Sequence, residues 1–142
     1  MDDDRVRAFE TALWVGGEEV YRQSVDRACL MVLPEAPFLM EGADAIAAVS
    51  RTPRWQEVEL SDLRISRPRE GLIVIAYGVR ASRQGEAFAA HCTSTYLRIA
   101  HEQWRVVQHQ QSVPPAAGGD TGDMEEAQRD AAEQREHEHG YN

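Results

Sequence analysis

The sequence predicts one α+β domain over residues 3–113, with three helices packed on a strongly curved, mostly antiparallel sheet. Apolar residues recur at helical spacing before residue 50, whereas from Trp55 onward they alternate with a period of two. The alternating segments are joined by short connections, which favours antiparallel neighbours. A chain of 142 residues with 42% hydrophobic residues is sufficient for one core.

The helices are predicted from apolar spacing and from their end signals. Val6, Phe9 and Leu13 recur at the three- and four-residue spacing of one buried face. Asp4 can cap this first helix, and Gly16 ends it. The first helix is expected between Asp4 and Gly16, and the other two are expected at residues 18–23 and 42–49.

Strands are predicted between the second and third helices and throughout the second half of the chain. Residues 28–33 are an apolar run closed by Pro34, and residues 38–40 form a short returning strand. The four long strands are expected at residues 57–65, 72–81, 87–99 and 104–112. Segments of this length exceed the usual five or six residues, so we expect a curved sheet that encloses a pocket.

The charge is distributed unevenly along the chain. Of the net charge of −9, residues 114–142 contribute eight acids against two arginines, with almost no apolar residue, and we expect an acidic, disordered tail. Residues 1–113 carry a net −3, which argues against nucleic acid as a partner. His137 and His139 are interpreted as solvated, and no metal site is predicted.

The remaining compositional signals favour a cytoplasmic location. No apolar run is long enough for a membrane helix, and the acidic residues 2–4 are unlike a secretory leader, so no membrane partner is expected. Cys29 and Cys92 lie in apolar or strand-forming runs without metal-ligand spacing, which predicts buried free thiols. No phosphate-binding, dinucleotide, hydrolase or metalloprotease motif is present, so no cofactor is implied.

A row of polar residues marks the strand at 87–99. Alternation places His91, Thr93 and Thr95 on one face, and if this face lines the pocket, His91 could act as a base or hydrogen-bond donor near neutral pH. The alternative is cross-strand hydrogen bonding or a subunit contact. Four aromatic residues are candidates either for the pocket wall or for the core: Trp14, Tyr21, Trp55 and Tyr77.

The order of elements, the strand His91-Cys92-Thr93-Ser94-Thr95-Tyr96 and the last strand from Trp104 to the His109-Gln110-Gln111 end resemble the nuclear transport factor 2-like superfamily. Residues 5–113 look like its domain of unknown function 4440 group, which is related to ketosteroid isomerases and SnoaL-type polyketide cyclases. The resemblance implies an acid just before a proline as general base of the isomerases. Leu33 occupies that place and cannot accept a proton, and Glu35 lies in an exposed turn, so this mechanism is not carried over.

The last strand has no cleanly apolar face. One face is expected to carry Trp104, Val106, Gln108 and Gln110, and the other Arg105, Val107, His109 and Gln111. Since sheets of the superfamily often pair across their convex surfaces, we expect a homodimer through the sheet.

Two function classes follow. The first is a protein that binds a small apolar molecule, with or without cofactor-free isomerase- or cyclase-like activity. The alternative is a non-catalytic module for homodimerisation or protein interaction.

Overall fold

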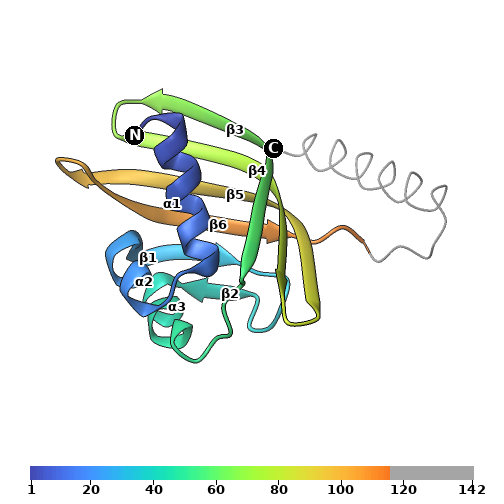
Figure 1. Ribbon diagram of the computed structural model, residues 1–142. Coiled ribbons are helices and arrows are strands. Elements are labelled where there is room, and N and C mark those ends of the chain that lie inside the picture. The colour runs from blue at the N-terminus through green and yellow to red at the C-terminus, as the bar shows by residue number, and fades with distance from the viewer. Residues whose placement is uncertain (116–142) are drawn as a thin grey trace, which may run out of the picture.

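The computed structural model describes residues 1–115 (Figure 1). Its elements are α1 (Asp3–Val15), α2 (Glu18–Ser24), β1 (Val25–Val32), β2 (Leu39–Glu41), α3 (Gly42–Val49), β3 (Glu57–Arg69), β4 (Leu72–Arg83), β5 (Glu86–Ala100) and β6 (Gln103–Ser112). The predicted α+β class is confirmed. From residue 116 onward, the predicted tail lies outside the described residues. None of the helices within residues 1–115 is long and apolar enough to cross a membrane.

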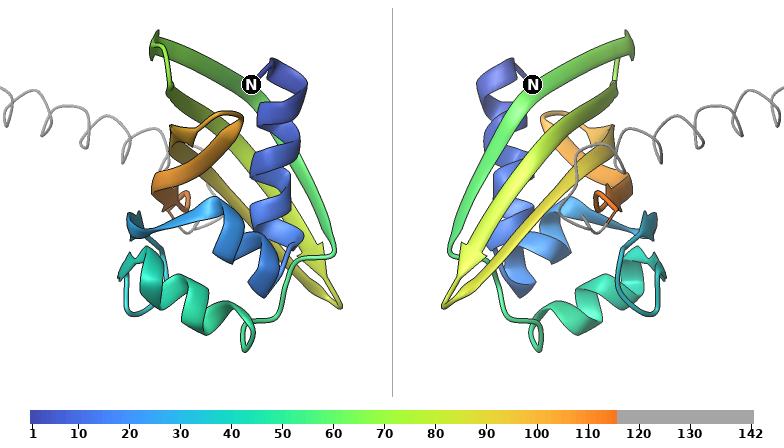
Figure 2. Two further views of the ribbon diagram at one scale, coloured as in Figure 1. Left: turned by 90° about the vertical axis from the view of Figure 1, so that its left-hand side faces the viewer. Right: turned by 90° about the vertical axis from the view of Figure 1, so that its right-hand side faces the viewer.

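The six strands form one sheet in the order β2-β1-β6-β5-β4-β3. Among the strands of residues 1–115, only the β1–β6 pair is parallel, because the chain crosses from β1 to the far side of the sheet before returning through β6. Figure 1 shows α1 lying across the sheet, and Figure 2 shows the long strands bending beside it. The register shifts in the β3–β4 and β5–β6 pairs increase the local twist, as bulges do.

The buried face of α1 differs from the predicted one. Val6, Glu10 and Trp14, spaced four residues apart, are the buried residues of the helix, whereas Phe9 and Leu13 are half-buried at its side. The N-cap is Asp2, two residues before the predicted Asp4, and the Asp2 carboxylate accepts the backbone N–H of Arg5 at 2.8 Å. Because Glu10 is one of the buried residues, its carboxylate faces the sheet from the middle of α1.

A bulge in β6 corrects the predicted faces of the last strand. The pairing with β5 shifts between Thr95–Gln108 and Tyr96–Val106, so that one residue of β6 is inserted at Val107. After this insertion, His109 lies on the same inner face as Val106 and not on the opposite one. A strict alternation with a period of two could not predict this change.

Helix α3 packs closely on β1 and closes one end of the molecule. Gly42 begins the helix at a point where a Cβ atom would lie only 1.8 Å from the carbonyl oxygen of Asp26. The absence of a side chain allows α3 to direct Ala45, Ala48 and Val49 toward the space between the helices and the sheet.

The two cysteines are buried and free, as predicted. Burial, with smaller contributions from nearby carboxylates, raises the pKa of the Cys29 and Cys92 thiols to about 12. Both thiols therefore behave as small apolar side chains of the core.

Candidate functional site

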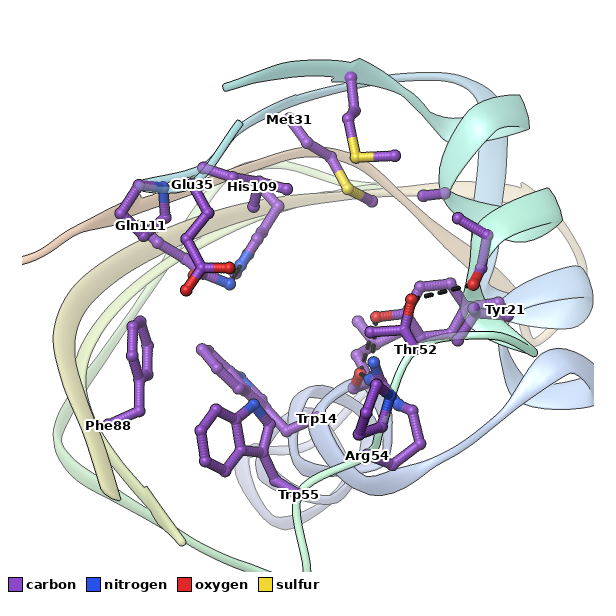
Figure 3. Close-up of a pocket in the computed structure, with 18 of the residues that line it drawn as sticks. Trp14, Tyr21, Met31, Glu35, Thr52, Arg54, Trp55, Phe88, His109 and Gln111 are labelled. Atoms are coloured by element: carbon purple, nitrogen blue, oxygen red, sulfur yellow. Dashed lines mark hydrogen bonds between the residues drawn. The ribbon is translucent and has the colours of Figure 1, made fainter. Parts of the chain in front are cut away.

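A pocket of about 240 Å³ lies between the three helices and the inner face of the sheet (Figure 3). Its wall is mainly apolar and includes Met31 of β1, Val49 of α3 and Phe88 of β5. For scale, an engineered cavity of about 150 Å³ binds benzene. The space is therefore suited to a molecule of one substituted ring.

Aromatic side chains form one side of the pocket. The ring centroids of Trp55 and Phe88 are 5.7 Å apart in a stacked arrangement, and those of Trp14 and Phe88 are 6.0 Å apart. The guanidinium carbon of Arg83 lies 4.0 Å from the centroid of the Trp55 ring and packs over that ring. These contacts hold the aromatic wall in a defined shape before any ligand enters.

Arg54 and Tyr21 form a polar part of the wall at the end of α1. Arg54 donates from Nε to the carbonyl of Gly16 at 2.7 Å and from Nη2 to the carbonyl of Leu13 at 2.5 Å. The Tyr21 hydroxyl donates to the same Leu13 carbonyl at 2.9 Å, and burial raises the pKa of this hydroxyl. Arg54 thus satisfies carbonyls that the helix end leaves free, while it remains at the pocket wall.

Beneath the pocket, Glu10 is completely buried and accepts three hydroxyl groups of the sheet. Its Oε2 accepts from Tyr77 and, at 2.7 Å, from Ser94, and its Oε1 accepts from Tyr96. We call these four residues the Glu10 cluster. Burial, reinforced by the neighbouring Glu10, raises the pKa of both tyrosines, so their hydroxyls stay protonated and donate.

His109 connects the Glu10 cluster to the pocket. Its Nδ1 lies 2.7 Å from Ser94 Oγ and 3.6 Å from Glu10 Oε2, and its Nε2 lies 3.1 Å from Gln111 Nε2. His109 and Gln111 both belong to the pocket wall. Burial lowers the pKa of His109 more than the nearby carboxylate of Glu10 raises it, so the imidazole is neutral at pH 7.

The structure divides the four predicted aromatic candidates. Trp14, Tyr21 and Trp55 lie on the pocket wall. Tyr77 lies outside that wall, in the Glu10 cluster, where its hydroxyl also accepts the indole N–H of Trp14 at 3.0 Å. The aromatic residues thus include both wall and core positions.

The predicted inward orientation of His91, Thr93 and Thr95 is wrong. The inner face of β5 is formed by the alternate residues, which include Ser94 and Tyr96, and His91 and Thr93 are exposed on the outer face. There, Thr95 donates to Gln108 Oε1 at 3.0 Å, and Gln108 Nε2 donates to Thr93 at 3.2 Å. The polar row is a cross-strand ladder, as in the alternative interpretation.

Sequence reasoning missed Glu10, Ser94 and His109 as a connected group. One signal was present, because Glu10 lies four residues from both Val6 and Trp14 and so interrupts an apolar row with an acid. An acid in such a row predicts either an exposed face or a buried carboxylate with partners. Those partners come from β4 and β5, far along the chain.

No protein-family model matches the chain, and no curated protein is significantly similar to it. Solved structures do share its fold. A proposed ketosteroid isomerase from Parabacteroides distasonis superposes with a TM-score of 0.65 at 15% identity, over 78% of this chain and 86% of the other. A nuclear transport factor 2-like protein from Cytophaga hutchinsonii gives 0.63 at 16% identity, over 80% and 99%.

The association domain of the Caenorhabditis elegans protein CaMKII superposes with a TM-score of 0.62 at 18% identity, over 78% of this chain and 91% of that domain. At such identities the similarity shows the fold alone. The chain has the nuclear transport factor 2-like fold that the resemblance implied.

Proposed function

We propose that this nuclear transport factor 2-like domain binds a small, mainly apolar molecule in its pocket. The observation that carries the proposal is the cavity of about 240 Å³, whose wall is mainly apolar but includes the polar groups of Arg54 and His109. Small-molecule sites typically combine an apolar wall with a few placed polar groups. The SnoaL-like grouping stays a prediction from sequence and is compatible with this function.

The size of the pocket limits the ligand. Since about 150 Å³ accommodates benzene, the pocket suits one ring with short substituents and does not enclose a fused four-ring molecule. The similarity to a proposed ketosteroid isomerase therefore supports the architecture of the site and not a steroid as its ligand.

Binding is proposed here in preference to isomerase-type catalysis by a carboxylate. Leu33 lies at the pocket wall in the place where the resemblance implies a general base. Glu35 also belongs to the wall but is exposed. An exposed carboxylate lacks the burial that adapts such a group to proton abstraction near neutral pH.

A pair of substitutions on α3 tests the proposal. Ala48 lies on the pocket wall, whereas its neighbour Ala47 is exposed. With toluene as the probe in an NMR titration, Ala48→Met should weaken saturable binding at least about tenfold, because the added side chain occupies the cavity. Ala47→Met is the matched control and should leave binding unchanged. Absence of saturable binding to the wild type, or equal effects of both variants, would contradict the proposal.

A second candidate function, homodimerisation through the outer face of the sheet, is favoured by an apolar strip. Leu30 of β1 is 64% exposed and Leu39 of β2 is 72% exposed, and Val32, which pairs with Leu39, is also exposed. An apolar strip of this kind on a sheet face is typical of a contact surface. The fold that this chain shares with an association domain also supports such a contact surface.

Sedimentation at micromolar concentration tests this second function. The wild type should sediment as a dimer, and Leu39→Lys should shift it toward the monomer because the charge would be buried in the contact. Phe38→Lys, at an exposed residue beside the strip, serves as a comparison. A monomeric wild type would remove dimerisation as a function.

A further inference from the structure

Hydrogen-bond directions in the Glu10 cluster determine where the proton of His109 lies. The Trp14 indole can only donate, so the Tyr77 hydroxyl accepts from it and directs its own proton to Glu10. The Ser94 hydroxyl has a single proton, which it donates to Glu10 Oε2 at 2.7 Å. The other contact of Ser94, at 2.7 Å to His109 Nδ1, is then donated by an Nδ1–H group.

A neutral imidazole with its proton on Nδ1 has a lone pair on Nε2. In this structure, Gln111 supplies an amide N–H to Nε2 at 3.1 Å, which agrees with this assignment. The His109 side chain is 12% exposed, and its exposed part belongs to the pocket wall. His109 Nε2 is therefore a hydrogen-bond acceptor at the pocket wall. The contact of Nδ1 with Ser94 in the core determines this tautomer of the imidazole.

We propose that His109 Nε2 is the proton acceptor of the pocket, positioned by Ser94 and Glu10, and that the ligand is a one-ring molecule with a hydroxyl group. The inference rests on the proposed function, because it requires the pocket to hold a ligand. The ligand hydroxyl donates to Nε2 and displaces the Gln111 amide. The aromatic wall of Trp14, Trp55 and Phe88 contacts the ring.

The same geometry supports transfer of the proton when the hydroxyl is acidic, as in a phenol or an enol. The O–H bond breaks, an Nε2–H bond forms, and the ligand becomes an oxyanion while the imidazole becomes an imidazolium. The imidazolium keeps its Nδ1–H bond to Ser94 and lies 3.6 Å from the Glu10 carboxylate, which stabilises its charge. The other charged groups of the pocket wall are Glu35, Arg54 and Arg83. No further reactant is needed.

The tautomer can be tested without any ligand. Long-range nitrogen–proton NMR spectra of the wild type should show His109 with its proton on Nδ1. Ser94→Ala should convert this pattern into a mixture of tautomers, because the acceptor for Nδ1–H is lost. The exposed His91 on the outer face is an internal control that should be unaffected. A proton on Nε2 in the wild type would overturn the inference.

A matched pair of probes tests the role in binding. Phenol and toluene have similar shapes, but only phenol can donate a hydrogen bond. Phenol should bind about fivefold more tightly than toluene to the wild type, as expected for one net hydrogen bond, and His109→Phe should abolish this preference. His91→Phe is the matched control and should preserve it. Gln111→Met should raise the ratio of phenol affinity to toluene affinity about twofold or more, because it removes the amide that competes for His109 Nε2.

The outcomes separate the two proposals. If toluene binds in the pocket but His109→Phe leaves the preference for phenol intact, His109 is not the acceptor and the proposed function stands. If neither probe binds, the proposed function fails and the acceptor role fails with it. In that case the NMR experiment still decides whether Ser94 and Glu10 set the tautomer of His109.

Discussion

Both faces of β5 carry polar side chains, but the two faces use them differently. On the outer face, His91 and Thr93 are exposed, and Thr93 accepts one hydrogen bond from Gln108 of the neighbouring strand. On the inner face, Ser94 and Tyr96 are completely buried and both donate to Glu10 of α1. Both faces are polar, but only the inner face lies opposite Glu10 of α1. The position of this partner, and not the polarity of the strand, therefore determines which face forms the Glu10 cluster.

The difference has an energetic consequence. Outer polar groups that lose a partner can bind water, so their net hydrogen bonds contribute little to stability. Inner groups that lose a partner remain buried without one, which costs about 1–3 kcal/mol for each neutral group. Substitutions of the same kind on the two faces should therefore differ strongly in effect.

The largest effect is expected for Glu10→Ala. The change leaves the hydroxyls of Tyr77, Ser94 and Tyr96 without their acceptor and opens a cavity, so the free energy of unfolding should fall by about 3–5 kcal/mol in urea denaturation. Glu18→Ala is the control, because Glu18 pairs with the exposed Arg22 and should change stability by less than about 1 kcal/mol. Equal effects would show that the Glu10 cluster does not stabilise the fold.

A smaller effect is expected when single hydroxyls are removed from the Glu10 cluster. Tyr77→Phe removes a donor to Glu10 and the acceptor of the Trp14 indole, whereas Tyr96→Phe removes only a donor to Glu10. We expect losses of about 2–3 kcal/mol for Tyr77→Phe and about 1–2 kcal/mol for Tyr96→Phe in the same denaturation experiment. The reverse order would mean that the Trp14 contact contributes nothing.

The fold was more accessible to sequence reasoning than the site, for a physical reason. Periodicity is local, and it located the third helix at residues 42–49, where the structure has Gly42–Val49. The site depends on contacts that are distant in sequence, such as those of Glu10 with Tyr77 and Tyr96, which are 67 and 86 residues away. Alternation shows that two faces exist but does not show which one is inside.

The bulge in β6 was a second obstacle. Without the insertion at Val107, His109 would lie on the face opposite Val106, as the sequence predicted, and no connection to Ser94 would follow. Bulges have no reliable sequence signal when the inserted residue is an ordinary β former such as valine. The outer row at His91, Thr93 and Thr95 was, in contrast, conspicuous in the sequence because its residues are uniformly polar.

A pH dependence of the stability should report the burial of His109 on the inner side of the sheet. Burial lowers the pKa of His109 in the folded state, so the unfolded chain binds the proton more readily. The stabilising contribution of the neutral imidazole is thus complete above the unfolded pKa of about 6.5 and is lost as the pH falls below it. Between pH 7 and pH 5, the free energy of unfolding should fall less in His109→Phe than in the wild type. A slope in His109→Phe as steep as that of the wild type would contradict the assignment.

The smallest effects are expected on the outer face of β5. His91→Ala removes an exposed side chain. Thr93→Ala removes the acceptor of one hydrogen bond donated by Gln108, and water can take the place of that acceptor. Each should change the free energy of unfolding by less than about 0.5 kcal/mol, the range of ordinary surface substitutions. Neither should change the binding of phenol or toluene, because the backbone of β5 separates both side chains from the pocket. A loss of probe binding in His91→Ala would place the ligand on the outer face and would reverse the distinction between the two sides of the strand.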